Sequence, residues 1–280
     1  MRTLLTSLGL VLLVLGLVYH FAALRAFNLL VPKDGGAARI AVDVAYGPHL
    51  RHRLDLYRPV QGQGPLPVLL FVYGGSWDSG RKEDYAFAAH AFAAHGYLTA
   101  VADYRLVPDV HYPGFVDDTA RALDWLADNA EDYGGDGEGI FVVGHSAGAY
   151  NAVQAVLRNG LHGRVSAMAS LAGPFDFLPL DSPKSTAAFA QAADLGETQP
   201  VHGDLSKAPP LLLLHGGGDS TVGLHNSRNL HAAYLREGRE SRLTIYKPIG
   251  HVGIMLALAK PLRHHAPVLD DILRFFQMYR

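Results

Sequence analysis

Hydrophobic and polar positions form two patterns along most of the chain: continuous apolar runs, and apolar residues that recur every three or four positions. Val68–Tyr73 and Ile140–Val143 are continuous apolar runs, which are typical of strands buried on both faces. Phe115–Asp132 repeats apolar residues every three or four positions, which predicts an amphipathic helix. Read this way, the sequence predicts strands at Ile40–Ala45, Arg53–Tyr57, Val68–Tyr73, Leu98–Ala102, Ile140–Val143, Val165–Leu171, Leu211–Leu214 and Leu243–Tyr246. It predicts helices at Tyr85–His95, Phe115–Asp132, Ala147–Arg158, Leu224–Arg236 and Val268–Met278.

Strands that alternate with helices pair in parallel through right-handed crossovers. The fold expected is therefore a three-layer α/β sandwich, with a mostly parallel central sheet and helices on both faces. The stretch from Pro174 to Pro210 breaks the alternation and is rich in Pro, Asp, Ser and Ala, so we interpret it as a small cap insertion. No linker divides the remainder, which predicts one domain over residues 31–280.

Composition narrows the class of protein. Apolar residues make up 49% of the 280 residues and charged residues 18%, a balance that supports a large buried core. The 24 Lys and Arg residues against 26 Asp and Glu residues form no long basic block, which argues against nucleic-acid binding. The chain has no cysteine, which excludes disulfides, a cysteine nucleophile and thiolate metal sites.

The first thirty residues form a separate segment. Arg2 precedes an almost unbroken apolar run from Leu4 to Val18, which indicates a membrane anchor or an export signal. Small residues are not well placed for cleavage, so we favour an uncleaved signal anchor over a cleaved signal peptide; an ordinary buried helix is the alternative. The bulk of the protein is then expected at a membrane, on the bacterial-type periplasmic or extracellular face. Because the core is expected to begin after Pro32, deletion of Met1 to about Leu30 is expected to leave a soluble protein that keeps its activity.

The segment Gly144–Gly148 matches the pattern G-x-S-x-G between a predicted strand and a predicted helix. This spacing presents a serine on a sharp, strained turn, and Gly144 and Gly148 keep side chains out of that turn. Ser146 is therefore the candidate nucleophile. In the simpler alternative, Ser146 only caps the following helix.

A serine hydroxyl needs a base to accept its proton, and that base needs an acid to orient it. His251 follows the last predicted strand through a short turn, and it is the candidate base; His264 and His265 are less favoured. Asp219 follows Leu211–Leu214, so the chain order Ser, Asp, His is that of α/β hydrolases. Asp176, after the preceding strand, is the alternative acid.

The segment Tyr73–Trp77 follows a buried strand and contains two glycines, which let the backbone approach a substrate closely. We expect the N–H groups of Gly75, Ser76 and Ala147 to bind the oxyanion. Tyr73, Gly74 and Trp77 are expected to support this loop.

Three other sequence patterns are interpreted as structural and not as catalytic or ligand-binding. Gly134–Gly139 is interpreted as a turn, since it precedes a strand and does not have the spacing of a phosphate-binding loop. His90 and His95 are five residues apart, which is the wrong spacing for a metal pair on a helix. Asp103–Arg105 is interpreted as a structural ion-pair turn. No metal or cofactor is expected.

Together these motifs resemble the α/β-hydrolase superfamily. They are most similar to its esterase branch with an H-G-G-x-W oxyanion motif, which includes feruloyl- and acetyl-esterase-like enzymes and kynurenine formamidases. Tyr73 stands where that branch has histidine. The histidine braces the loop, and the resemblance implies the same role for Tyr73.

The function expected is that of a serine carboxylic-ester hydrolase acting on small acyl or aryl esters. The alternatives are an arylformamidase, another amide hydrolase or a peptidase using the same triad, an inactive exported binding module, and a membrane-tethered scaffold. Four apolar residues of the cap are consistent with either a substrate pocket or core packing: Phe175, Phe177, Leu178 and Leu180.

Overall fold

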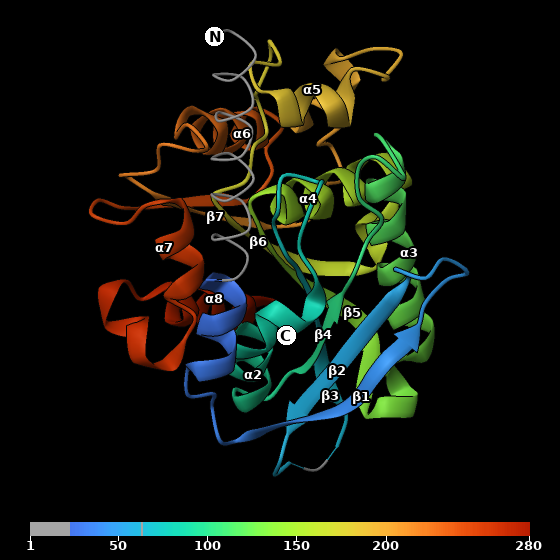
Figure 1. The fold of residues 1–280 in the computed structure, drawn as a ribbon, viewed down its shortest axis with the longest axis vertical. Coiled ribbons are helices and arrows are strands. Elements are labelled where there is room, and N and C mark those ends of the chain that lie inside the picture. The colour runs from blue at the N-terminus through green and yellow to red at the C-terminus, as the bar shows by residue number, and fades with distance from the viewer. Residues whose placement is uncertain (1–22, 63) are drawn as a thin grey trace, which may run out of the picture.

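The computed structural model describes residues 23–62 and 64–280, and its centre is a single eight-stranded sheet (Figure 1). The strands occur in the order β1-β2-β4-β3-β5-β6-β7-β8. Their bounds are β1 Ala37–Ala45, β2 Arg53–Pro59, β3 Leu66–Val72, β4 Leu98–Ala102, β5 Gly135–His145, β6 Val165–Leu171, β7 Leu211–Gly216 and β8 Ser241–Tyr246.

The first two strands form an antiparallel edge, and the remaining neighbours pair in parallel. β2 runs antiparallel to both β1 and β4, whereas β4, β3, β5, β6, β7 and β8 all run in one direction. The carboxyl ends of β3, β5, β7 and β8 therefore meet at one edge of the sheet, which is where α/β folds place ligands.

Helices cover both faces of this sheet. The helices are α2 Ala86–Ala94, α3 Gly114–Asn129, α4 Ala147–Asn159, α5 Pro183–Phe189, α6 His225–Arg236, α7 His251–Leu256 and α8 Val268–Phe276. Figure 1 shows α3 and α4 on one side of the sheet and α2 and α8 on the other. The expected three-layer sandwich with a mostly parallel sheet is confirmed.

The interpretation of Gly134–Gly139 as a turn holds for Gly134 and is wrong for the rest, because β5 already begins at Gly135. Gly135 pairs with Leu66 of β3. A side chain at Gly135 would lie 2.7 Å from the Val68 side chain and 2.9 Å from the Ala130 and Leu98 side chains. The glycine is required by close packing at the start of a strand, not by a reversal of the chain.

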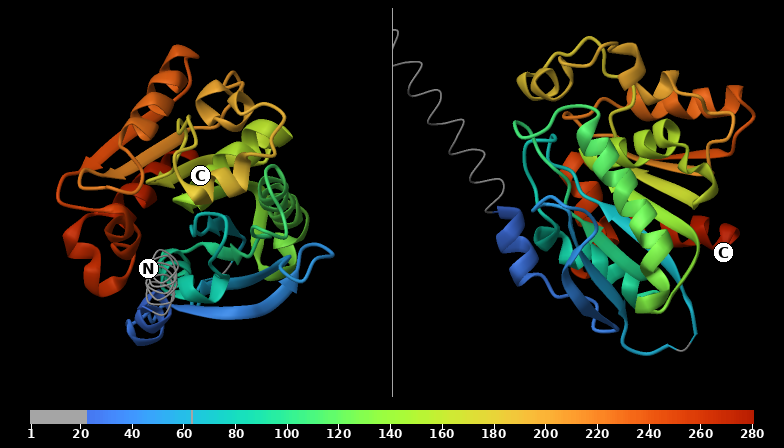
Figure 2. Two further views of the ribbon diagram at one scale, coloured as in Figure 1. Left: turned by 45° about the horizontal axis from the view of Figure 1, so that its top comes forward. Right: turned by 90° about the vertical axis from the view of Figure 1, so that its right-hand side faces the viewer.

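Two short helices were not predicted. α7 begins directly at His251, and α5 lies in the segment between β6 and β7 that the sequence analysis assigns to a cap. Figure 2 shows α5 and its neighbouring turns projecting beyond the sheet at the same end as α6. Both helices are too short to show a clear sequence period, since neither exceeds seven residues.

Residues just before the predicted domain boundary at residue 30 pack against the domain. Residues 23–30 are helical, and we call this segment the N-terminal helix. Phe27 meets the ring of Phe87 edge-on at 5.4 Å, and the Asn28 side chain accepts a hydrogen bond from the Phe87 backbone at 3.1 Å. Because these contacts attach the helix to α2, a deletion that ends at Leu30 removes part of the folded domain.

Most of the predicted anchor, residues 1–22, lies outside the described residues. Within residues 23–62 and 64–280, no helix combines the length and the apolar character needed to cross a membrane.

Candidate active site

Ser146 occupies a strained turn between β5 and α4. Its backbone has φ 54° and ψ −126°, a conformation that costs a non-glycine residue about 1–3 kcal/mol. The two flanking glycines leave no room for side chains: an added Cβ would lie 2.4 Å from the Ala149 backbone at Gly144 and 2.2 Å from the Val72 carbonyl oxygen at Gly148. The sequence spacing therefore reflects a steric requirement of this turn.

The structure brings Ser146, His251 and Asp219 together from three separate loops. His251 Nε2 lies 2.9 Å from Ser146 Oγ, and His251 Nδ1 lies 2.8 Å from Asp219 Oδ2. Since a carboxylate only accepts hydrogen bonds, Nδ1 carries the proton in this arrangement and the Nε2 lone pair faces the serine hydroxyl. This arrangement suits proton transfer from the serine to the histidine.

Asp219 is held as an anion. Its side chain is fully buried, and burial alone would raise its pKa; hydrogen bonds with His215 and His251 and from the Val222 backbone outweigh that effect and hold the pKa of Asp219 well below its ordinary value. Asp219 Oδ1 accepts hydrogen bonds from the backbone N–H groups of Thr221 at 2.8 Å and Val222 at 2.9 Å. The carboxylate can therefore orient His251 and stabilise it when it becomes charged.

The alternative triad members lie elsewhere. Asp176 Oδ2 accepts a hydrogen bond from the Asn229 amide at 2.6 Å, away from His251. The rings of His264 and His265 lie against each other, tilted, with centroids 4.1 Å apart in the short helical segment Lys260–His265. The structure brings none of these three residues to Ser146.

The loop predicted to bind the oxyanion packs directly on the Ser146 turn. A side chain at Gly74 would lie 2.8 Å from the Ser146 side chain. Gly75, Ser76 and Trp77 all have positive φ, with values of 143°, 51° and 62°. Ala147 is the first residue of α4, where backbone N–H groups have no acceptor within the helix. The Ala147 N–H group is therefore without a partner inside its own helix.

Trp77 fixes the far end of this loop. Its indole N–H donates a hydrogen bond to the Asn151 side chain of α4 at 2.9 Å, and its ring meets Phe189 of α5 edge-on at 4.8 Å. The loop is thus attached both to α4, the helix that directly follows Ser146, and to the cap.

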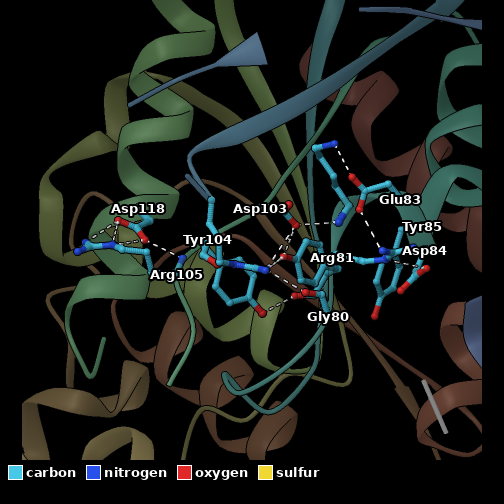
Figure 3. Close-up of polar contacts among 12 residues, drawn as sticks. Gly80, Arg81, Glu83, Asp84, Tyr85, Asp103, Tyr104, Arg105 and Asp118 are labelled. Carbon is cyan, nitrogen blue, oxygen red and sulfur yellow. Dashed lines mark hydrogen bonds and ion pairs between the residues drawn. The ribbon is translucent and has the colours of Figure 1, made fainter. Parts of the chain in front are cut away.

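Beneath the loop lies a buried polar network. The Tyr73 hydroxyl donates a hydrogen bond to Asp103 Oδ1 at 2.5 Å and accepts one from Arg51 at 2.8 Å. The Lys82 backbone also donates to Asp103 Oδ1, at 2.8 Å. Figure 3 shows Asp103 between the segment Gly80–Tyr85 and the neighbouring Tyr104. Tyr73 therefore braces the loop from below.

The segment Asp103–Arg105 forms structural ion pairs, as predicted. Asp103 lies 3.5 Å from Arg51, and Arg105 lies 2.7 Å from Asp118 of α3 (Figure 3). Burial raises the pKa of Asp103, although the Tyr73 hydrogen bond and the Arg51 charge oppose this. None of the three residues lines the active-site cavity.

Two histidines of the site were missed by the sequence analysis. His145 is buried, and its Nε2 donates a hydrogen bond to the His251 carbonyl at 3.0 Å; burial, with a smaller contribution from His251, lowers its pKa to about 3. His215 is fully buried and hydrogen-bonds to Ser227 at 2.7 Å and to the Val222 carbonyl at 3.0 Å. His145 lies inside the G-x-S-x-G motif, and His215 directly follows the predicted strand Leu211–Leu214. These positions were the available signal among fifteen histidines.

A cavity of about 750 Å³ adjoins Ser146 and His251. The cap residues proposed as a pocket do not line it: Phe175 is fully buried, and Phe177 packs on Phe189 at 5.2 Å. The sequence allowed either a substrate pocket or core packing for the cap residues, and Phe175 and Phe177 fit core packing. The cavity is lined by Ala23, Leu24, Phe27, Gly74, Gly75, Ser76, Ser79, Tyr85, His145, Ser146, Lys184, Thr221, His251, Val252, Met255 and Leu256.

This sheet, with a serine, a histidine and an aspartate hydrogen-bonded at its carboxyl edge, defines an α/β hydrolase. The chain belongs to the BD-FAE family, whose model matches residues 54–234. Esterase B from Lactobacillus rhamnosis, solved with a tributyrin phosphonate inhibitor, has a similar fold: the TM-score is 0.82 over 96% of this chain and 94% of that one, at 18% identity.

Curated relatives carry esterase names. Isoprenylcysteine alpha-carbonyl methylesterase ICME of Arabidopsis thaliana is 28% identical over 82% of this chain and 60% of its own length. Carboxylesterase NlhH of Mycobacterium tuberculosis is 39% identical over 39% of this chain and 34% of its own length. The chain spans 34% to 62% of the length of the plant methylesterases that it matches.

Replacement of the two candidate acids by asparagine separates their roles. Asp219→Asn favours the wrong tautomer of His251, so kcat for an activated ester should fall on the order of 10⁴-fold. Asp176→Asn makes the same chemical change outside the triad and should alter kcat by less than about threefold, the size of a surface effect. A larger loss of kcat in Asp176→Asn than in Asp219→Asn would overturn the assignment.

Tyr73→Phe tests whether the Tyr73 hydroxyl only supports the loop. It removes a hydrogen bond to a charged group, which should cost about 1.5–3 kcal/mol of stability. Because the hydroxyl does not touch the reacting atoms, kcat/KM should fall by about tenfold or less, against about 10²–10³-fold for loss of an oxyanion donor.

The matched control is Tyr234→Phe, which removes a fully buried hydroxyl that has no hydrogen-bond partner among the described residues. Thermal unfolding and ester kinetics of both variants provide the comparison. A loss of kcat/KM of a hundredfold or more in folded Tyr73→Phe would contradict a purely supporting role.

Proposed function

We propose that the protein is a serine carboxylic-ester hydrolase. The observation that carries this proposal is the continuous hydrogen-bonded line from Ser146 through His251 to Asp219, with distances of 2.9 and 2.8 Å. The esterase names of the relatives support the same activity.

The reaction follows from this geometry. Ser146 Oγ attacks the ester carbonyl while His251 Nε2 accepts its proton, and the carbonyl oxygen becomes an oxyanion near the N–H groups of Gly75, Ser76 and Ala147. The tetrahedral species collapses, and His251 returns the proton to the departing alcohol. Water then attacks the acyl-serine, with His251 again accepting the proton, and releases the acid.

The names of the plant relatives, isoprenylcysteine alpha-carbonyl methylesterases, support a methyl ester as one candidate substrate type. Amide hydrolysis on the same triad is the rival activity. An inactive binding module is disfavoured because all three triad groups lie within hydrogen-bonding distance.

A p-nitrophenyl acyl ester and the corresponding p-nitroanilide test this proposal. The ester should be hydrolysed with the higher kcat/KM, and Ser146→Ala should lower kcat for it by about 10³–10⁶-fold. Ser206→Ala, which changes an exposed serine outside the cavity, is the matched control. Faster turnover of the anilide would favour an amide hydrolase, and unchanged turnover in Ser146→Ala would refute the mechanism.

We also propose that the N-terminal segment anchors the protein in a membrane, with the catalytic domain exported. The support is the apolar run from Leu4 to Val18 behind Arg2. After cell fractionation, the full chain should sediment with membranes, whereas a chain that starts at Ala23 and keeps the N-terminal helix should remain in the supernatant. Identical fractionation of both chains would contradict the anchor.

A further inference from the structure

One side of the active-site cavity is made by two helices from opposite ends of the chain. The N-terminal helix contributes Leu24 and Phe27, and α7 contributes Val252, Met255 and Leu256. Both sets have helical i, i+3 or i, i+4 spacing, which places each on one face of its helix. Figure 1 shows the N-terminal helix beside α7. We call these five residues, together with Ala23, the two-helix wall.

The wall begins at the reaction centre. His251 is the first residue of α7, so Val252 directly follows the base, and Met255 and Leu256 lie one turn further on. The wall therefore extends from the triad toward the N-terminal helix. A group attached to a carbonyl at Ser146 would lie along it.

The wall offers no hydrogen-bond partner for a polar substrate group, because all six of its side chains are apolar. Among the described lining residues, the one lysine is Lys184 of α5, and its ammonium group pairs with Asp78 at 2.9 Å. An uncompensated polar group would lose its hydration here, whereas a hydrocarbon chain would gain from burial.

The wall is also held in place. Beyond the Phe27–Phe87 contact, the Asn28 amide donates a hydrogen bond to the Glu83 carbonyl at 2.8 Å. The helix residues that point away from the cavity are exposed: 72% of Leu29 and 83% of Leu30 are accessible to solvent. The N-terminal helix thus presents a defined inner face to the cavity.

We propose that the two-helix wall binds the hydrocarbon chain of a lipid ester whose carbonyl lies at Ser146. This inference rests on the proposed esterase function and specifies its substrate class. A cavity of about 750 Å³ lies in the range of pockets that enclose whole drug-sized ligands, and an acetyl group would leave most of it to water. Long aliphatic esters, and not the small acyl esters expected from the sequence, are the substrates that fill it.

The test places an aspartate on the N-terminal helix at two positions, one lining the cavity and one facing solvent, and compares their effects on ester hydrolysis. The full-length chain in phospholipid nanodiscs is assayed with p-nitrophenyl esters from acetate to decanoate. Each buried methylene should raise kcat/KM about two- to fourfold in the wild type. Leu24→Asp should lower the decanoate-to-acetate ratio of kcat/KM at least tenfold.

Leu30→Asp is the matched control, because it makes the same change on the exposed face of the same helix. It should leave the ratio within about twofold of wild type, and it experiences the same partitioning of long esters into lipid. Leu24→Ser, a milder change, should lower the ratio in the same direction if Leu24→Asp fails to fold.

The outcomes separate this inference from the proposed function. Hydrolysis of all chain lengths with equal ratios in Leu24→Asp, Leu24→Ser and Leu30→Asp would overturn the lipid-ester inference and leave the esterase intact. Absence of hydrolysis for every ester would overturn both. A ratio that falls only in the two Leu24 variants supports the wall as the chain-binding surface.

Discussion

The strained backbone of Ser146 is the constraint on which the site depends. A serine held at φ 54° persists only if its surroundings exclude every relaxed alternative. β5 fixes the residue before it, α4 fixes the residue after it, and Gly148 lets the β3 backbone approach within a distance that no side chain would permit. The Ser146 hydroxyl therefore projects toward His251 as a consequence of how strand and helix are joined.

A second constraint links the loop Tyr73–Trp77 to the two-helix wall through the segment Gly80–Tyr85. Arg51 donates to the Gly80 carbonyl at 2.9 Å, and the Lys82 backbone donates to Asp103. One residue later, the Glu83 carbonyl accepts the Asn28 hydrogen bond that holds the N-terminal helix. The network that braces Tyr73 and the contact that positions the two-helix wall thus share one short segment. Movement of this segment would displace the loop and the wall together.

The sequence pattern predicted the strands, the longer helices and the Ser146 turn, because each of these is determined by residues close together in the chain. Buried parallel strands and amphipathic helices have their own periods, and the G-x-S-x-G spacing reflects sterics within five residues. The triad followed because chain order and strand ends place Asp219 and His251 at the same sheet edge as Ser146. The loop at Tyr73–Trp77 followed from its two glycines directly after a buried strand.

Features that arise from tertiary contacts were missed. Gly135 looks like a turn residue until the side chains of Val68 and Leu98 are packed against it. The N-terminal helix continues an apolar run, so its inner face, marked by Leu24 and Phe27, does not stand out by period. The cavity wall joins residues near 25 and 255, a pairing that spacing cannot reveal. His145 and His215 have roles defined only by the partners that folding brings to them.

The central claim is that Ser146 is a uniquely activated nucleophile, and covalent labelling tests it most directly. The full-length chain is treated with an alkyl fluorophosphonate, and the adduct is counted by intact mass and located by peptide sequencing. We expect one phosphonate per chain, bonded to Ser146, with ester hydrolysis lost in proportion to labelling and no adduct in Ser146→Ala. Retention of full esterase activity in completely labelled protein, or a stoichiometric adduct at another residue, would contradict it.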